Sequence, residues 1–111
     1  MQFKLKKGRT TLAVKVKQAD GFARYIGLMF KKRSSNALLF KFQKGRAAIH
    51  SLFVFFPFVA VWLDDKNNVK KVEVVKPFRL CVRGPREACA LIEIPLSKRH
   101  EKILRKLGVL F

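Results

Sequence analysis

The stretch AAIHSLFVFFPFVAVWL, residues 47–63, decides the fold class, because its 17 residues are long enough for a membrane-spanning helix or for two buried strands. His50, Ser51 and the central Pro57 oppose a spanning helix, and charged residues close the run at both ends. More than half of the segment is β-branched or aromatic, which suits strands better. We therefore expect strands over 48–55 and 58–64, interrupted at Pro57 and buried on both faces, and no membrane span.

Residues on either side of this segment alternate with a period of two, which is typical of strands. Apolar residues and lysines alternate over 2–6 and 11–17, and Gly8 with Arg9 separates the two runs, so we expect an opening β-hairpin. Further strands are expected over 37–42 and 69–75, the latter after a turn at 65–68. Residues 80–82 and 88–94 are expected to pair as a last hairpin. The alternation predicts one interior shared by side chains from Phe3 through Ile94.

Two short helices complete the expected fold. Asp20 can cap a helix over 21–29, and Ser97 can cap a closing helix over 98–107 that ends at Gly108. The apolar stripe of the closing helix is formed by Ile103, Leu104 and Leu107. The sequence thus predicts a mainly β (α+β) fold: one compact β-sandwich or barrel-like domain over 1–111 with two short helices.

The charge balance is strongly basic, with 25 Lys and Arg against 7 Asp and Glu and a net charge of +18. Such a charge favours nucleic acid, anionic lipid or an acidic protein as a partner, although a solvated surface without a dedicated partner is the other interpretation. Most Phe residues fall at inward positions, which favours contact with phosphate backbones over base stacking. The candidate nucleic-acid contacts are Lys31, Lys32, Arg33, Lys98, Arg99, Lys102, Arg105 and Lys106.

No pattern of side chains indicates a catalytic centre. His50 and Ser51 are adjacent in a strand and would point to opposite faces, so they cannot act as a base and a nucleophile. His100 is interpreted as incidental, and Asp64 as a carboxylate that caps a turn. Glu93 interrupts an apolar strand, so its charge needs a partner, such as Arg24 or a cluster of backbone donors. We expect no enzyme activity, no catalytic residue, no metal site and no cofactor.

Three further expectations concern the cysteines, the location and the assembly. Cys81 and Cys89 lie symmetrically about Pro85, which allows a cross-strand disulfide or two free buried thiols, the latter being favoured. The polar first residues do not resemble a signal peptide, so a cytoplasmic location is expected. Exposed backbone on the first or last hairpin would allow a homodimer.

Five pieces of the sequence, in order, resemble one known family. They are ARYIGLMF (23–30), ALLFKF (37–42), IHSLFVFFPFVAVWLD (49–64), KPFR (76–79) and ALIEIP (90–95). Together they resemble the family catalogued as domain of unknown function number 192, over residues 19–108. The resemblance implies a compact β-sandwich or barrel-like domain with short helices, and it implies no settled activity.

The chain departs from the bacterial pattern of that family, which reads Phe-Trp-Met-Lys-Asn-Thr and then Pro-Leu-Asp in the buried stretch. Apolar residues stand at the polar positions of that pattern, and His50 resembles the usual residue of an archaeal branch, which indicates an archaeal source. The expected function is a non-catalytic binding or accessory domain for an unknown ligand or protein; the alternative is sequence-independent nucleic-acid binding through the basic surface. The candidate ligand residues are Arg24, Met29, His50 and Glu93.

Overall fold

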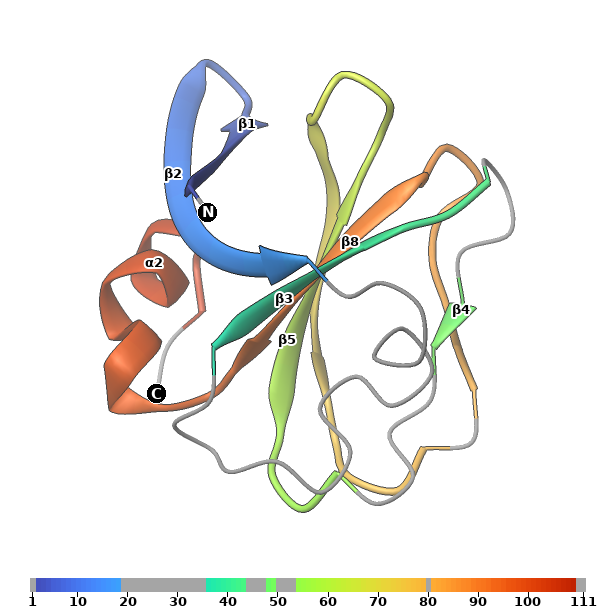
Figure 1. Ribbon diagram of the computed structural model, residues 1–111, viewed down its shortest axis with the longest axis vertical. Coiled ribbons are helices and arrows are strands. Elements are labelled where there is room, and N and C mark those ends of the chain that lie inside the picture. The colour runs from blue at the N-terminus through green and yellow to red at the C-terminus, as the bar shows by residue number, and fades with distance from the viewer. Residues whose placement is uncertain (1, 19–35, 44–47, 50–53, 80, 110–111) are drawn as a thin grey trace.

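A computed structural model describes residues 2–18, 36–43, 48–49, 54–79 and 81–109 of the chain (Figure 1). Most of the described residues form strands, joined by short turns and followed by one helical segment. The elements in chain order are β1 (Gln2–Lys7), β2 (Thr10–Gln18), β3 (Ala37–Lys41), β4 (Ala48–Ile49), β5 (Phe58–Leu63), β6 (Val69–Val75), β7 (Val82–Arg83), β8 (Ala90–Pro95), the 3₁₀ turn η1 (Lys98–His100) and the helix α2 (Glu101–Lys106).

Six strands form one sheet in the order β1-β2-β3-β8-β5-β6, in which only the β2–β3 pair is parallel. The sheet curls, and the Lys6 N–H donates a hydrogen bond of 2.8 Å to the Asn67 carbonyl, which brings β1 beside the start of β6. Figure 1 shows the resulting half-barrel. The predicted mainly β, barrel-like fold is therefore confirmed.

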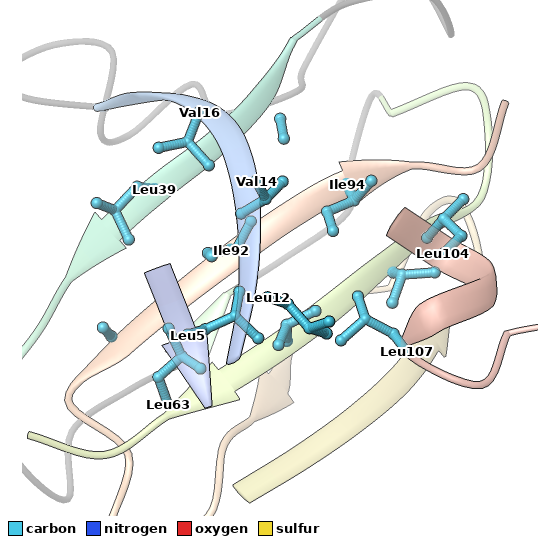
Figure 2. Packing of buried hydrophobic residues seen from close by; sticks show 14 of the residues in the cluster. Leu5, Leu12, Val14, Val16, Leu39, Leu63, Ile92, Ile94, Leu104 and Leu107 are labelled. Atoms are coloured by element: carbon cyan, nitrogen blue, oxygen red, sulfur yellow. The ribbon is translucent and has the colours of Figure 1, made fainter. Parts of the chain in front are cut away.

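Two neighbouring strands of the sheet, β5 and β8, are buried along their whole length, as near-continuous apolar strands require. Because both faces of these strands are apolar, the sheet has a core on each face, and the expectation of one shared interior is wrong. The helix-side core (Figure 2) consists of Leu5, Leu12, Val14, Val16, Ala37, Leu39, Val59, Val61, Leu63, Ala90, Ile92, Ile94, Leu104, Leu107 and Val109. The Trp62 core on the other face consists of Leu38, Phe40, Val54, Phe56, Phe58, Ala60, Trp62, Val75, Val82, Ala88 and Leu91.

The opening hairpin is confirmed, as are the strands expected over 37–42, 58–64 and 69–75 to within one residue. Of the strand expected over 48–55, residues 48–49 form β4, whereas Val54 and Phe55 belong to no strand. Residues 50–53 lie outside the described ranges. The expected helix over 21–29 also lies outside them.

The expected last hairpin is wrong. Strand β7 pairs with β4, through Ala48↔Arg83 and Ile49↔Val82, while β8 lies between β3 and β5. A strand that is apolar on both faces needs a neighbour on each edge, and a hairpin with the two-residue β7 would leave β8 nearly unpaired. Cys81 and Cys89 are consequently not placed opposite each other and form no disulfide. Cys81 is exposed and Cys89 half-buried, so the expectation of two buried thiols is wrong for Cys81.

The closing helix is confirmed in two pieces, η1 and α2, and it ends at Gly108, whose φ of 87° is in the left-handed region. The predicted capping bond is wrong. Ser97 precedes η1, but its hydroxyl makes no cap bond and is buried without a hydrogen-bond partner in the described part of the chain. A six-residue helix is unstable alone, so its position depends on Leu104 and Leu107 in the helix-side core.

The segment that raised the question of a membrane span is described from residue 54 onward, where it forms a short connection and then β5. In the part of the chain that the structure describes, no helix has the length and apolar character needed to cross a membrane.

Candidate functional site

A cleft of about 260 Å³ lies between the outer side of β2 and the C-terminal helical segment. We call it the basic cleft, because three cationic side chains and a histidine line it and none of its lining residues is acidic. Its lining residues are Ala13, Val14, Lys15, Asn36, Arg99, His100, Lys102 and Ile103.

The periodicities of the two elements explain why cations gather here. In β2, the period of two directs Leu12 and Val14 into the helix-side core and leaves Lys15 exposed. In α2, Leu104 packs into the same core, so Lys102 remains on the outside. Packing the helix on the strand thus brings Lys15 to the same cleft as Arg99 and Lys102. Figure 1 shows α2 next to the curve of β2.

Asn36, which directly precedes β3, lines the cleft and contacts one of its cations. A guanidinium nitrogen of Arg99 donates a hydrogen bond to Asn36 Oδ1 across 63 residues of sequence. His100, which follows Arg99, is 9 % exposed and makes contacts of its own. His100, incidental in the sequence-based interpretation, is thus a buried residue that lines the basic cleft.

Lys and Arg far outnumber Asp and Glu in the two segments that form the cleft. The β1–β2 hairpin carries six Lys and Arg and no acid, and residues 96–109 carry five Lys and Arg and one acid, Glu101. The Glu101 carboxylate forms a salt bridge with Arg105, one helical turn away. A second hollow beside the basic cleft, lined by Lys7, Thr10, Thr11, Leu12 and Lys106, extends the positive surface along the hairpin.

The five predicted cations of the closing helix are all exposed, and they have different surroundings. Arg99 and Lys102 line the basic cleft, Lys106 lines the second hollow, and Arg105 pairs with Glu101. Lys98 lines none of the described clefts. The predicted contacts Lys31, Lys32 and Arg33 lie outside the described residues.

Sequence reasoning missed Lys7 and Lys15 as part of this surface. The alternation of β2 indicated that Lys15 points outward, which the structure confirms, whereas Lys7 is exposed at the last residue of β1 without having been predicted so. No signal in one sequence indicated that the C-terminal helix would pack beside them, because that contact joins residues more than 80 positions apart.

Glu93 is the second feature of functional interest. It lies in the middle of β8, flanked by Leu38 of β3 and Ala60 of β5, and it is 4 % exposed. The register places it on the face of the sheet that carries the Trp62 core. Burial raises the pKa of its carboxyl from 4.5 to about 8, so Glu93 is mostly protonated at neutral pH.

Of the predicted ligand residues, the structure describes only Glu93; Arg24, Met29 and His50 lie outside the described ranges. Within those ranges, no salt bridge or hydrogen bond joins Glu93 to another side chain, and the predicted partner Arg24 lies outside them. Burial favours the protonated, uncharged form of the Glu93 carboxyl. The described residues also hold no group of three His, Cys, Asp or Glu side chains that could bind a metal ion.

Asp64 has the structural role that the sequence predicted. Its carboxylate accepts hydrogen bonds of 2.9 Å from the backbone N–H groups of Lys66 and Asn68, and it lies 3.8 Å from the Lys70 ammonium. Desolvation would raise the pKa of Asp64, but these hydrogen bonds outweigh it and the pKa is lowered. The carboxylate therefore stabilises the β5–β6 turn.

The architecture has close counterparts among solved structures. A protein of unknown function from Novosphingobium aromaticivorans superposes with a TM-score of 0.71 at 13 % identity, covering 98 % of this chain and 79 % of that one. A protein of Sinorhizobium meliloti, described as a proposed transcription regulator, superposes with a TM-score of 0.71 at 19 % identity, covering 96 % and 84 %. At these identities the likeness shows the fold alone.

Sequence comparisons are more specific. A UPF0127 protein of the archaeon Thermococcus kodakarensis is 34 % identical over 88 residues, which are 75 % of this chain and 55 % of the relative, so the chain spans about half of that relative's length. This similarity agrees with the archaeal branch that His50 indicated. The family model of DUF192, described as "Uncharacterized ACR", matches residues 3–103. The chain therefore belongs to the DUF192 family.

Proposed function

We propose that this chain is a non-catalytic binding domain whose partner is a polyanion, and that the basic cleft is the binding site. The observation that carries the proposal is the convergence of Lys15, Arg99 and Lys102 on one cleft without an acid among its lining residues. Each of these cations can contact a phosphate or another anionic group.

The chemistry of the cleft favours binding over catalysis. Its described lining contains no hydroxyl, thiol or carboxylate that could serve as a nucleophile beside His100. The surrounding charge would attract a chain of phosphates over a long distance, and nucleic acid is a polyanion of this kind. Binding through phosphates alone would be independent of base sequence.

Glu93 supports a second candidate, a small ligand held on the face of the Trp62 core. A buried carboxyl that keeps its proton can donate a hydrogen bond to a ligand. The other residues predicted for that site, Arg24, Met29 and His50, are not described, so the proposal of a polyanion has the broader support.

A triple variant in which Lys15, Arg99 and Lys102 are each replaced by Gln tests the proposal. Fluorescence anisotropy with a labelled single-stranded 20-mer would measure affinity across a salt series. If the three side chains contact phosphates, the affinity at low salt should fall by about tenfold or more, and the slope of log K against log [salt] should become shallower by about 2.

A matched control removes three lysines from the β5–β6 hairpin, as Lys66→Gln, Lys70→Gln and Lys71→Gln. Two of these lysines already have acidic partners, Asp64 and Glu73, and the net charge falls by the same amount. We expect this control to change the affinity and the slope much less than the cleft variant. Equal losses in both variants, or no binding of the wild type at low salt, would contradict the proposal.

A further inference from the structure

Two large apolar side chains lie on the surface in contact with each other. Phe55 is 61 % exposed and Phe78 is 56 % exposed, and their rings meet edge to face with centroids 5.6 Å apart. Phe55 lies three residues before Phe58 and Phe78 three residues after Val75, and Phe58 pairs with Val75 at the end of the β5–β6 ladder. The pair therefore lies at the open end of the β5–β6 hairpin, just before β5 begins and just after β6 ends.

The position of this pair is energetically unfavourable for the free protein. Phe78 has a φ of 64°, a left-handed conformation that bulky residues rarely adopt. Its ring also remains in water although the Trp62 core lies on the sheet nearby. Strained backbone and exposed aromatic surface are features that proteins retain mainly where a partner binds.

The charges next to the pair indicate the kind of partner. Lys76 and Arg79 flank Pro77 and Phe78, and both cations are exposed. No acidic residue occurs in 54–58 or 74–81. A partner that matches both features carries anionic groups together with flat apolar surfaces, which is the chemistry of single-stranded nucleic acid. In a duplex the bases are stacked on each other and cannot reach the rings.

We propose that Phe55 and Phe78 form a base-stacking platform, with Lys76 and Arg79 contacting the adjoining phosphates, and that the polyanion bound by this domain is single-stranded nucleic acid. This inference rests on the proposed polyanion binding and adds the class of partner. It also revises the sequence-based preference for binding without stacking, which assumed that the Phe side chains point inward.

The test compares Phe78→Ala with Phe78→Tyr on three labelled probes: a single-stranded 20-mer of thymidine, a 20-mer of the same backbone without bases, and a 20-base-pair duplex. Loss of one stacked base should reduce the affinity of Phe78→Ala for the thymidine strand by about five- to a hundredfold. Its affinity for the abasic strand and for the duplex should stay within twofold of the wild type. Phe78→Tyr keeps an aromatic face and should bind all three probes as the wild type does.

A further variant, Phe78→Leu, separates stacking from simple apolar contact and is expected to behave as Phe78→Ala. The stacking inference is overturned if Phe78→Ala binds the thymidine strand as tightly as the wild type or loses the same affinity for all three probes. It is also overturned if Phe78→Leu binds the thymidine strand as tightly as the wild type. In those cases wild-type binding of the abasic strand would leave the basic cleft proposal standing. Failure of the wild type to bind any probe at low salt would overturn both proposals.

Discussion

The free energy of unfolding of the wild type is expected to fall between about pH 4.5 and pH 8, and Glu93→Gln is expected to remove most of that fall. The two limits are the ordinary pKa of a glutamate and the raised pKa of Glu93 in the fold. In this window the unfolded chain has released the proton and the folded chain still holds it. The unfolded state therefore binds fewer protons, and the free energy of unfolding decreases as the pH rises.

The size of the effect follows from the width of that window. One pH unit corresponds to about 1.4 kcal/mol for a single group, so complete titration would lower the free energy of unfolding by about 5 kcal/mol. This is comparable to the whole stability of a small domain. The stabilising contribution of the buried proton is fully present below pH 4.5 and is lost as the pH rises towards 8.

Urea denaturation from pH 4 to pH 9 would measure this dependence for the wild type, Glu93→Gln and the control Glu87→Gln. Glu87 is exposed, so its variant should keep the slope of the wild type. Glu93→Gln should have a much flatter profile and should exceed the wild type in stability at pH 9. A wild-type stability that rises between pH 5 and pH 8 would show that Glu93 is ionised in the fold.

Gly84→Ala is expected to lower the free energy of unfolding by about 3 kcal/mol. A Cβ at this position would lie 2.4 Å from Cε3 and 2.6 Å from Cζ3 of the Trp62 indole. Trp62 is fully buried, and its Nε1 donates a hydrogen bond of 2.9 Å to Glu73 Oε1, so the ring has little freedom to move away. Alanine in place of glycine lowers the conformational entropy of the unfolded chain, which stabilises the fold, but overpacking of this kind outweighs that stabilisation.

A double variant distinguishes this overlap from a general effect of the substitution. Trp62→Phe removes the larger ring system and opens space next to position 84. Chemical denaturation would measure the free energy of unfolding of both single variants and of the double variant. The loss in the double variant should be smaller than the sum of the two single losses, by about 1 kcal/mol or more. Additive losses, or a Gly84→Ala variant as stable as the wild type, would contradict the described packing of Gly84 on the indole.

The parts of the fold predicted from sequence are those with local patterns. Alternation identified the β1–β2 hairpin, and the apolar run identified β5 as a strand buried on both faces. The pairing of β8 was not predictable in the same way, because an apolar strand such as β8 carries no preference for β7 over β3 and β5. The failure of Ser97 as a cap likewise depends on where η1 docks.

The candidate site was predicted only in part for a similar reason. Charge and helical spacing identified Arg99 and Lys102, but Lys15 joined them through a contact between distant parts of the chain. Glu93 was recognised because a carboxyl in an apolar strand is unusual, whereas its protonation depends on the depth of burial that the sheet creates. Most Phe residues were expected at inward positions, and no local pattern distinguished Phe55 and Phe78, which lie just beyond the ends of β5 and β6.

The most direct test of polyanion binding at the basic cleft is an NMR titration of the ¹⁵N-labelled chain at low salt with the 20-mer that lacks bases, so that stacking on Phe55 and Phe78 does not contribute. The account predicts that the largest chemical-shift changes occur at amides that line the cleft: Ala13, Lys15, Asn36, Arg99 and Lys102. If these amides do not shift and the changes centre on the strands around Glu93, the proposal of binding at the basic cleft is contradicted. That result would favour the small-ligand site on the other face of the sheet.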